Sequence, residues 1–264
     1  MTLGSSFGDR LTMVGPVEGA LAHGDEGIGR MSEPEEIATA TRRALGPRDL
    51  EGRRVLVTAG PTYEPIDPVR FLGNRSTGKM GVAVAVEAAS RGAAVTLVLG
   101  PDTIQPPPGI DIVEVHTAQD MHDAVLSRLA TSDAVVMAAA VADFRPKEVA
   151  SGKLKKDDGV PELVLEPTPD IALELGERKR TGQVIVGFAA ETAEIEDAGR
   201  AKLRRKNLDL LVANLVGSEG TGFGADTNDA AILTAGGEDT PRRSWTKPEL
   251  AHAICDRLAS LLGS

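Results

Sequence analysis

The sequence predicts an α/β fold, namely a doubly wound, mostly parallel, Rossmann-like sheet of about six strands with helices on both faces. Two observations predict this fold class. From Arg53 onward, short apolar runs of strand length alternate with longer segments of helix length. The short runs are continuously apolar, which is typical of parallel strands that are covered by helices on both faces.

The first half of this region predicts three strands and two helices. The strands are expected at residues 53–60, 93–101 and 133–144, where valine, leucine and alanine dominate. The helices are expected between them, at residues 78–92, which end on a glycine, and at residues 118–130.

The second half continues the alternation. In order, it predicts a helix near residues 171–180, a strand at 183–192, a charged helix ending at Lys206, strands at 208–216 and 229–237, and a helix from Lys247. Ligands of doubly wound sheets bind beyond the carboxyl ends of the strands. We therefore expect a site built from the segments AGPT, LGP, AAAVAD, GFAAET and ANLV.

Residues 1–50 are predicted to be an appendage to a domain at residues 51–264. Up to Met31 they are rich in glycine and short polar residues, and no strand pattern accompanies them. The segment SEPEEIATATRRAL then predicts a helix with Ser32 as its N-cap, acidic at its start and basic at its end. We expect this appendage to lack a core of its own and to be partly disordered.

Composition excludes several classes of protein. The chain has 264 residues, of which 41% are hydrophobic, so it can bury a sizeable core. Its net charge of −10 argues against binding of nucleic acid, and no apolar run is long enough for a membrane span. The single cysteine, Cys255, lies in the apolar pattern of the last helix and is expected to be a buried thiol. These features favour a cytoplasmic protein with no membrane partner.

The stretch GNRSTGKMG, residues 73–81, almost matches the phosphate-binding loop G-x-x-x-x-G-K-[ST]. Met80 stands where that loop needs a magnesium-binding hydroxyl, and residues 61–72 separate the stretch from the strand that such a loop follows directly. The stretch still suits an anion, because Ser76 precedes a helix N-terminus and Gly78 permits close approach of the backbone. An ordinary capped helix is the alternative interpretation.

A nicotinamide cofactor is not expected. The first strand ends in Gly60-Pro61 rather than G-x-G-x-x-G, and proline lacks an amide that a pyrophosphate would use. The second strand ends in Gly100-Pro101, without the acidic residue that binds a ribose hydroxyl.

Two basic clusters also suggest a small anionic ligand. Lys202 and Lys206 are four residues apart on one helix face, where their charges repel slightly unless a polyanion binds them. The cluster KLKK, residues 153–156, lies in an irregular segment that could close over such a ligand. Solvated surfaces are the alternative interpretation for both clusters. Asp226 and Asn228 are expected to cap a turn before the last strand.

A series of motifs resembles the bacterial phosphopantothenoylcysteine synthetases, the CTP-dependent phosphopantothenate–cysteine ligases of coenzyme A biosynthesis. In order they are VLVTAGPTYEPIDPVRFLGNRSTGKMG, AAAVADFRP, KLKK, TPDI, GFAAET, KLRRKNLDLLVAN and GFGADTND. The resemblance runs from about Arg53 to the C-terminus. It implies that 4′-phosphopantothenate reacts with CTP to give an acyl-cytidylate and pyrophosphate, and that the amine of L-cysteine then displaces CMP.

The resemblance also implies roles for individual residues. Asn74 holds the substrate carboxylate and the acyl-cytidylate, with Arg70 close by, and Lys153 on a flap acts in the first half-reaction. Contact with the nucleotide is implied for Asp170, Phe188, Lys202 and Lys206.

Position along the chain adds further candidates. Ser76 and Gly78 are expected in the substrate site at the helix N-terminus. Gly60 and Ala139 lie at strand ends and are expected to contact the nucleotide, because small side chains leave the backbone accessible to a base. Asp143 is expected to contact the nucleotide and to assist binding of the Mg²⁺ that accompanies CTP.

The N-terminal stretch GPVEGALAHGDEGIGRMSEPEEI is similar to the last part of the flavin-containing phosphopantothenoylcysteine decarboxylases, which precede the synthetase in fused bacterial proteins. The flavin-binding body is not in this sequence, so neither FMN nor decarboxylase activity is expected. The family resemblance further implies a homodimer with each site near the subunit interface. Two other hypotheses are a catalytically idle nucleotide-binding or scaffold module and a Rossmann oxidoreductase.

Overall fold

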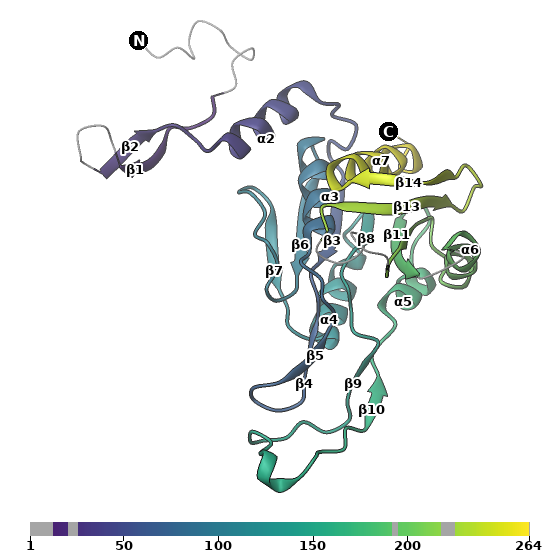
Figure 1. Ribbon diagram of the computed structural model, residues 1–264. Coiled ribbons are helices and arrows are strands. Elements are labelled where there is room, and N and C mark those ends of the chain that lie inside the picture. The colour runs from purple at the N-terminus through teal and green to yellow at the C-terminus, as the bar shows by residue number, and fades with distance from the viewer. Residues whose placement is uncertain (1–12, 21–25, 192–194, 218–224, 264) are drawn as a thin grey trace, which may run out of the picture.

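The computed structural model describes residues 13–20, 26–191, 195–217 and 225–263. Its central sheet has eight strands in the order β14-β13-β12-β11-β8-β3-β6-β7, which confirms the predicted fold class but exceeds the expected strand count (Figure 1). In chain order the strands are β3 (Arg54–Ala59), β6 (Ala94–Leu99), β7 (Asp111–Glu114), β8 (Ala134–Met137), β11 (Val184–Glu191), β12 (Leu210–Leu215), β13 (Thr227–Thr234) and β14 (Thr240–Thr246). Neither β7 nor β14 is predicted from the sequence, because β7 is short and β14 is mostly polar and exposed.

Six neighbouring strands, from β12 to β7, are parallel, and β13 and β14 at one edge are antiparallel. In the centre, Val55 of β3 lies opposite Val95 of β6 and Ala134 of β8. The chain runs from β3 outward through β6 and β7, returns to β8 on the other side, and continues through β11 and β12. The strand order therefore reverses between β3 and β8, where doubly wound sheets bind their ligands.

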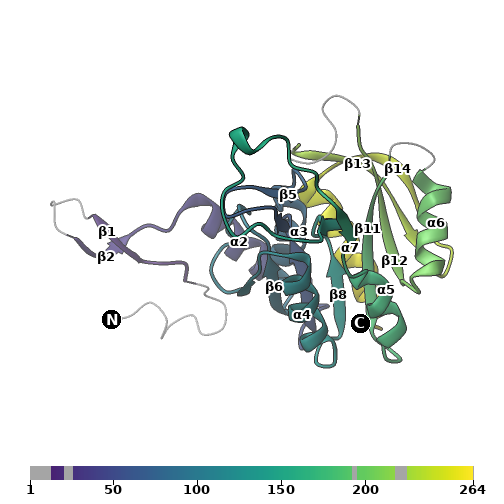
Figure 2. The ribbon, with the colours of Figure 1, turned by 90° about the horizontal axis from the view of Figure 1, so that it is seen from below.

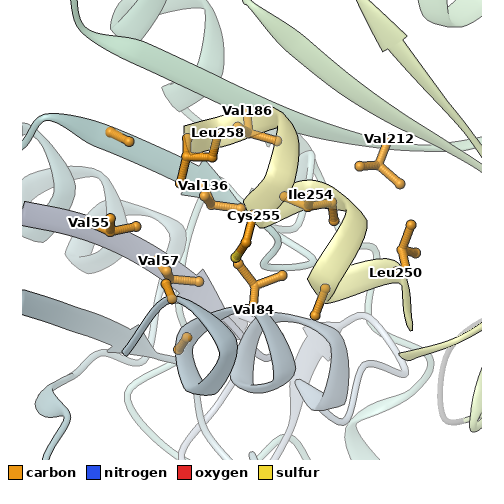
Figure 3. Close-up of a cluster of buried hydrophobic side chains, with 14 of the residues drawn as sticks. Val55, Val57, Val84, Val136, Val186, Val212, Leu250, Ile254, Cys255 and Leu258 are labelled. Carbon is orange, nitrogen blue, oxygen red and sulfur yellow. The ribbon is translucent and has the colours of Figure 1, made fainter. Parts of the chain in front are cut away.

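Helices cover both faces of the sheet (Figures 1 and 2). α3 (Lys79–Ser90) and α7 (Lys247–Leu261) pack on one face, and α4 (Ala118–Leu129), α5 (Ile171–Arg178) and α6 (Ile195–Arg205) pack on the other. Each face of the sheet has its own hydrophobic core. Figure 3 shows the core on the face covered by α3 and α7, where valines of four strands meet Val84 of α3 and Leu250 of α7. Cys255 is fully buried there, as predicted, and burial raises the pKa of its thiol, so its role is packing.

Two small antiparallel ladders lie together beyond the carboxyl end of the sheet, in the lower part of Figure 1. β4 (Tyr63–Pro65) pairs with β5 (Phe71–Gly73), and β9 (Phe144–Pro146) pairs with β10 (Leu165–Pro167). A short 3-10 helix, Lys156–Asp158, lies between β9 and β10 in the chain. We call these two segments, residues 63–73 and 144–167, the arm. The β4–β5 hairpin explains why the phosphate-loop-like stretch does not follow its strand directly.

The N-terminal part contains β1 (Val17–Ala20) and β2 (Glu26–Arg30), paired antiparallel, and then α2 (Pro34–Leu45). The expectation that this part has no strand is wrong, because glycines obscure the pattern of two short, largely exposed strands. α2 contacts α3, and β1 and β2 extend away from the main sheet (Figure 1). The disorder predicted within residues 1–50 concerns in part residues 1–12 and 21–25, which lie outside the described residues.

None of the helices that the structure describes is both long and apolar enough to cross a membrane.

Candidate functional site

A cavity of about 630 Å³ opens at the carboxyl ends of the parallel strands, beside the point where the strand order reverses. This volume is typical of pockets for cofactors and small substrates. Residues 74, 76–81, 137–144, 167–172 and 187–190 form most of its wall. Lysines line it from three helical segments, namely Lys79, Lys202, Lys206 and Lys247.

Most of the predicted site residues line this one cavity. They are Asn74, Ser76, Gly78, Ala139, Asp143, Asp170, Phe188, Lys202 and Lys206. Gly60, Arg70 and Lys153 do not line it.

The side chain of Asn74 is bound to the segment that follows β8. Its Nδ2 donates hydrogen bonds of 3.1 Å each to the carbonyl oxygens of Ala140 and Val141. An amide group has two hydrogens to donate, so Nδ2 can bind an anionic oxygen only by exchanging one of these bonds. Ser76 shapes the next turn, because its Oγ accepts from the Gly78 amide at 3.3 Å.

Gly60 and Gly78 are needed for the packing around Thr103. Their φ angles are +87° and +71°, and a Cβ on either residue would overlap the Thr103 side chain. Both positions therefore require glycine for conformational and steric reasons. Gly78 caps α3 at the cavity wall, whereas Gly60 has a structural role behind that wall.

Three amides of the segment after β8 are bound by residues 58–62. The Ala139 amide donates to Thr58 Oγ1 at 3.0 Å, and the Ala140 amide donates to the Gly60 carbonyl at 2.9 Å. The Ala142 amide donates to Thr62 Oγ1 at 3.0 Å. Because the fold uses the Ala139 amide, contact between Ala139 and a base would have to use its carbonyl oxygen or side chain.

Lys202 on α6 and Lys206 directly after it are each paired with a carboxylate. Lys202 Nζ lies 2.6 Å from Glu191 Oε1, and Lys206 Nζ lies 2.8 Å from Asp170 Oδ1. These partners offset the repulsion between the two lysines, so that repulsion is no argument for a ligand. Asp170 Oδ1 also accepts from the Leu173 amide at 3.1 Å, so the same carboxylate caps α5 and positions Lys206.

The carboxylates that line the cavity are Asp143 and Asp170. Within the described part of the chain, no group of three or more His, Cys, Asp or Glu side chains is arranged to hold a metal ion. Magnesium commonly binds through one or two carboxylates together with substrate phosphates. The exposed Asp143 fits that mode of binding.

Arg70 and Lys153 lie on the arm. Arg70 Nη1 lies 3.1 Å from Asp67 Oδ2, and Arg70 Nη2 donates to the carbonyl of Leu154, next to Lys153, at 3.1 Å. Burial raises the pKa of Asp67, but hydrogen bonds from the backbone amides of Val69, Leu154 and Arg70 lower it by more, so the net pKa is below its ordinary value. Asp67 thus joins the two segments of the arm.

The prediction that Asn228 caps a turn is wrong, and the turn that Asp226 is predicted to cap includes residues 218–224, which lie outside the described residues. Asn228 is buried in β13, where its Nδ2 donates to Asn214 Oδ1 at 3.1 Å. Asp226 Oδ1 lies 2.6 Å from Lys79 Nζ, and this hydrogen bond lowers the pKa of the Asp226 carboxyl. Both residues therefore belong to a polar network at the cavity.

Lys247 completes this network and is not predicted from the sequence. Its Nζ donates to Asn228 Oδ1 at 2.8 Å, and it lines the cavity from the first position of α7. The sequence does hold one signal, because a lysine directly after the N-cap residue Thr246 is placed where the helix dipole disfavours a cation.

A doubly wound sheet whose reversal point carries lysines and a helix N-terminus defines a class of α/β proteins that bind nucleotides or other phosphate-bearing ligands. Within this class the particular family is clear. The chain belongs to the family of the DNA/pantothenate metabolism flavoprotein C-terminal domain, whose model matches residues 50–262.

Similar proteins agree with this family. The chain is 46% identical over 259 residues to the coenzyme A biosynthesis bifunctional protein CoaBC of Bacillus subtilis strain 168, covering 97% of this chain and 64% of that protein. It is 42% identical over 256 residues to a cysteine/cysteine sulfinic acid decarboxylase of an unknown prokaryotic organism, covering 95% of this chain and 71% of that protein. The crystal structure of the C-terminal domain of a CoaBC protein superposes with a TM-score of 0.70 at 40% identity, covering 82% of this chain and 98% of that domain. These findings confirm the resemblance found in the sequence motifs.

Proposed function

We propose that this chain is a phosphopantothenate–cysteine ligase, which uses CTP to join 4′-phosphopantothenate and L-cysteine in coenzyme A biosynthesis. The observation that carries the proposal is the single cavity of about 630 Å³ that Asn74, Lys202 and Lys206 line together. The similarity to CoaBC supports it, although the chain spans only 64% of the length of the Bacillus subtilis protein. The choice of CTP is supported by the family resemblance.

In the first half-reaction, a carboxylate oxygen of 4′-phosphopantothenate attacks the α-phosphorus of CTP, and the bond from that phosphorus to the bridging oxygen breaks to release pyrophosphate. Negative charges approach one another in this step, so cationic and amide groups lower its barrier most. Lys202 and Lys206 would contact the phosphates by sharing or releasing Glu191 and Asp170. Asn74 would hold the carboxylate by exchanging one of its carbonyl partners.

In the second half-reaction, the cysteine nitrogen attacks the acyl carbon, loses a proton to solvent and displaces CMP. The mixed anhydride must be kept from water until the amine arrives. Lys153 lies on the arm rather than on the cavity wall, so its proposed action on the nucleotide requires movement of the arm.

A bound Mg²⁺ would neutralise phosphate charge and favour departure of pyrophosphate. Asp143 is the residue at the cavity that would hold it, with the remaining ligands coming from CTP and water. No flavin has a role in this proposal.

The proposed assembly is a cytoplasmic homodimer that forms through the arm. The arm carries large exposed apolar side chains, which are Val69, Phe71, Phe144, Val149, Val160, Leu163, Val164 and Leu165. Exposed apolar surface of this extent favours contact with another protein. A second copy packed on the arm would place each cavity near the subunit interface, as the family resemblance implies.

The proposal is tested by measuring pyrophosphate release with CTP or ATP in the presence of 4′-phosphopantothenate, Mg²⁺ and cysteine. We expect release with CTP that depends on phosphopantothenate, and product formation slowed about 100-fold or more in Asn74→Ala. Gln119→Ala, which removes an amide side chain outside the cavity, is the matched control and should keep full activity. A folded protein that releases pyrophosphate from neither nucleotide would be an idle binding or scaffold module, and NADPH oxidation would indicate an oxidoreductase.

A further inference from the structure

Residues 151–163, which form most of the loop between β9 and β10, extend away from the sheet and carry Lys153 (Figure 1). Of the residues here whose burial the structure describes, Leu154 alone is half-buried and the others are exposed. Among the described residues, the hydrogen bonds that join this loop to the rest of the arm are made by the backbone of Leu154. The position of Lys153 therefore depends on how its neighbour Leu154 is held.

Asp67 and Arg70, in the other segment of the arm, hold Leu154 by both of its backbone groups. The Leu154 amide donates to Asp67 Oδ2 at 3.1 Å, and the Leu154 carbonyl accepts from Arg70 Nη2 at 3.1 Å. Arg70 Nη1 donates to the same carboxylate oxygen, Asp67 Oδ2, at 3.1 Å. One oxygen of Asp67 thus binds the loop and also the arginine that binds the loop.

The side chain of Asp67 is fixed by its own turn, independently of the loop. Its Oδ1 accepts from the amides of Val69 and Arg70 at 2.8 Å each, and the Ile66 amide donates to the Arg70 carbonyl at 2.8 Å. Binding of backbone amides by Oδ1 is enough to close such a turn. The side chain is nevertheless fully buried, and a buried carboxylate needs donors for its second oxygen as well. The loop and the Arg70 guanidinium supply those donors.

We propose that Asp67 is a positioning residue for Lys153, because it anchors the loop at Leu154 so that Lys153 moves together with the arm. This inference rests on the proposed function, in which Lys153 acts on the nucleotide. An ammonium group next to an anchored residue loses less conformational entropy on contact with a ligand than one on a freely moving loop. Asp67 does not line the cavity, so it acts through Lys153.

The first test measures whether Asp67 anchors the loop. In Asp67→Asn the remaining oxygen can still close the turn, but an NH₂ group replaces Oδ2 and faces the Leu154 amide, which is also a donor. We expect hydrogen exchange of the amides in residues 150–156 of the full chain, measured by mass spectrometry, to become about 10-fold faster or more. Glu166→Gln is the matched control, because Glu166 pairs with Arg145 within the β9–β10 ladder, and exchange should stay within about 2-fold.

The second test measures whether this anchoring serves Lys153. We expect Asp67→Asn to slow pyrophosphate release from CTP with 4′-phosphopantothenate about 10-fold, measured with the protein in excess of CTP so that slow variants remain measurable. In a Lys153→Met background, the same substitution should change the rate by less than about 2-fold, because no ammonium is left to position. A purely structural effect of Asp67 would instead slow both backgrounds by the same factor. Glu166→Gln should leave the rate unchanged in both backgrounds.

Unchanged hydrogen exchange in Asp67→Asn would overturn the anchoring. An unchanged rate, or equal slowing in the wild-type and Lys153→Met backgrounds, would overturn the positioning role while the ligase activity stands. Absence of pyrophosphate release from the unaltered chain would refute the proposed function, and the positioning role with it. If Asp67→Asn does not fold, Asp67→Ser decides by the same criteria, because a serine hydroxyl can close the turn but is too short to reach the loop.

Discussion

At the scale of the residue, Gly60 and Gly78 allow their segments to pack closely against Thr103. Gly78 lies at the cavity wall and Gly60 lies behind it. Both have positive φ angles, and both leave room for the Thr103 side chain. A side chain at either position would add backbone strain of roughly 1–3 kcal/mol and a steric overlap. These glycines therefore act on the site through the fold.

We expect Gly60→Ala to lower the free energy of unfolding by about 2–4 kcal/mol, measured by urea unfolding. The double variant Gly60→Ala/Thr103→Ala should recover part of this loss, because the overlap with Thr103 Oγ1 is removed while the strain at φ +87° stays. Gly236→Ala is the control, since a Cβ there meets nothing within 4 Å, and it should change stability by less than about 1 kcal/mol. Wild-type stability of Gly60→Ala would contradict this account.

Residues next to recognisable motifs could be predicted, and buried polar residues far apart in the chain could not. Asn74 and Ser76 precede a helix after a glycine-containing stretch, so their position at a site follows from local chemistry. Apart from its unfavourable place at the start of a helix, Lys247 looks like a solvated lysine in the sequence, because its burial arises only when α7 packs against α3. The carboxylate partners of Lys202 and Lys206 are likewise contributed by other elements and have no local sequence signal.

At the scale of the element, Arg91 joins the end of α3 to α7 and to the segment before β3. Its side chain is 3% exposed, its Nε donates to Asp49 Oδ1 at 2.8 Å, and its Nη1 lies 2.7 Å from Asp256 Oδ1. Together with Glu87 Oε1 at 3.8 Å, this buried cation has three carboxylate partners, which fix the packing of α3 against α7 beside the cavity.

Arg91→Met should lower the free energy of unfolding by about 3 kcal/mol, because Asp49 and Asp256 lose their common partner. Urea unfolding would measure this. Arg48→Met breaks an exposed ion pair with Glu51 of 2.8 Å and should cost less than about 1 kcal/mol. Equal effects of the two substitutions would show that Arg91 does not hold the helices together.

His122 links α4 to α5 and makes their packing depend on pH. Its Nε2 lies 2.7 Å from Glu174 Oε2, and its Nδ1 lies 2.8 Å from Asp123 Oδ1. Partial burial lowers the pKa of His122, but the two carboxylates raise it by more, so the net pKa is above the ordinary value of 6.5. The hydrogen bond from His122 lowers the pKa of Glu174 below its ordinary value of 4.5.

The signs of these shifts define a pH window. A raised histidine pKa contributes stability that is complete below pH 6.5 and is lost as the pH rises through the raised value, and a lowered carboxyl pKa contributes stability that is lost on acidification below pH 4.5. The stability advantage of the wild type over His122→Gln should therefore shrink as the pH rises from 6.5 through the raised pKa of His122. Urea unfolding at several pH values measures it, and a constant difference would contradict the linkage.

Elements with strong periodicity could be predicted, and those formed by edge pairing could not. β3, β6, β8 and β11 are continuously apolar, and the capped helices α4 and α7 have clear start signals. β14 consists mostly of polar residues, which form a strand because they pair with β13 at the edge of the sheet. β1 and β2 also depend on pairing, because among the described residues each is paired with the other in a separate two-stranded sheet.

At the scale of the whole molecule, the arm is the surface that the proposed dimer requires. Its apolar side chains lie outside both cores of the chain, and Phe71 is stacked on Tyr63 with ring centroids 3.7 Å apart. The arm also carries Arg70 and Lys153, which the chain does not bring to its own cavity wall. In the proposed dimer, Arg70 and Lys153 would instead lie near the cavity of the second copy.

We expect the wild type to elute as a dimer in size-exclusion chromatography with light scattering, and Phe144→Ser to shift it toward the monomer, because Phe144 is exposed on β9. Leu261→Ser, on an equally apolar but distant exposed position of α7, is the control and should leave the dimer intact. A monomeric wild type, or a Phe144→Ser dimer as stable as the wild type, would refute the arm as the interface.

The central claim, that this chain couples an acid to an amine through an acyl-cytidylate, is tested most directly with 4′-phosphopantothenate labelled with ¹⁸O in its carboxylate. The carboxylate oxygen that attacks the α-phosphorus stays on that phosphorus when cysteine displaces CMP. Mass spectrometry of the products should therefore find one ¹⁸O atom in CMP for each amide formed. Unlabelled CMP, or label in orthophosphate instead, would contradict the account.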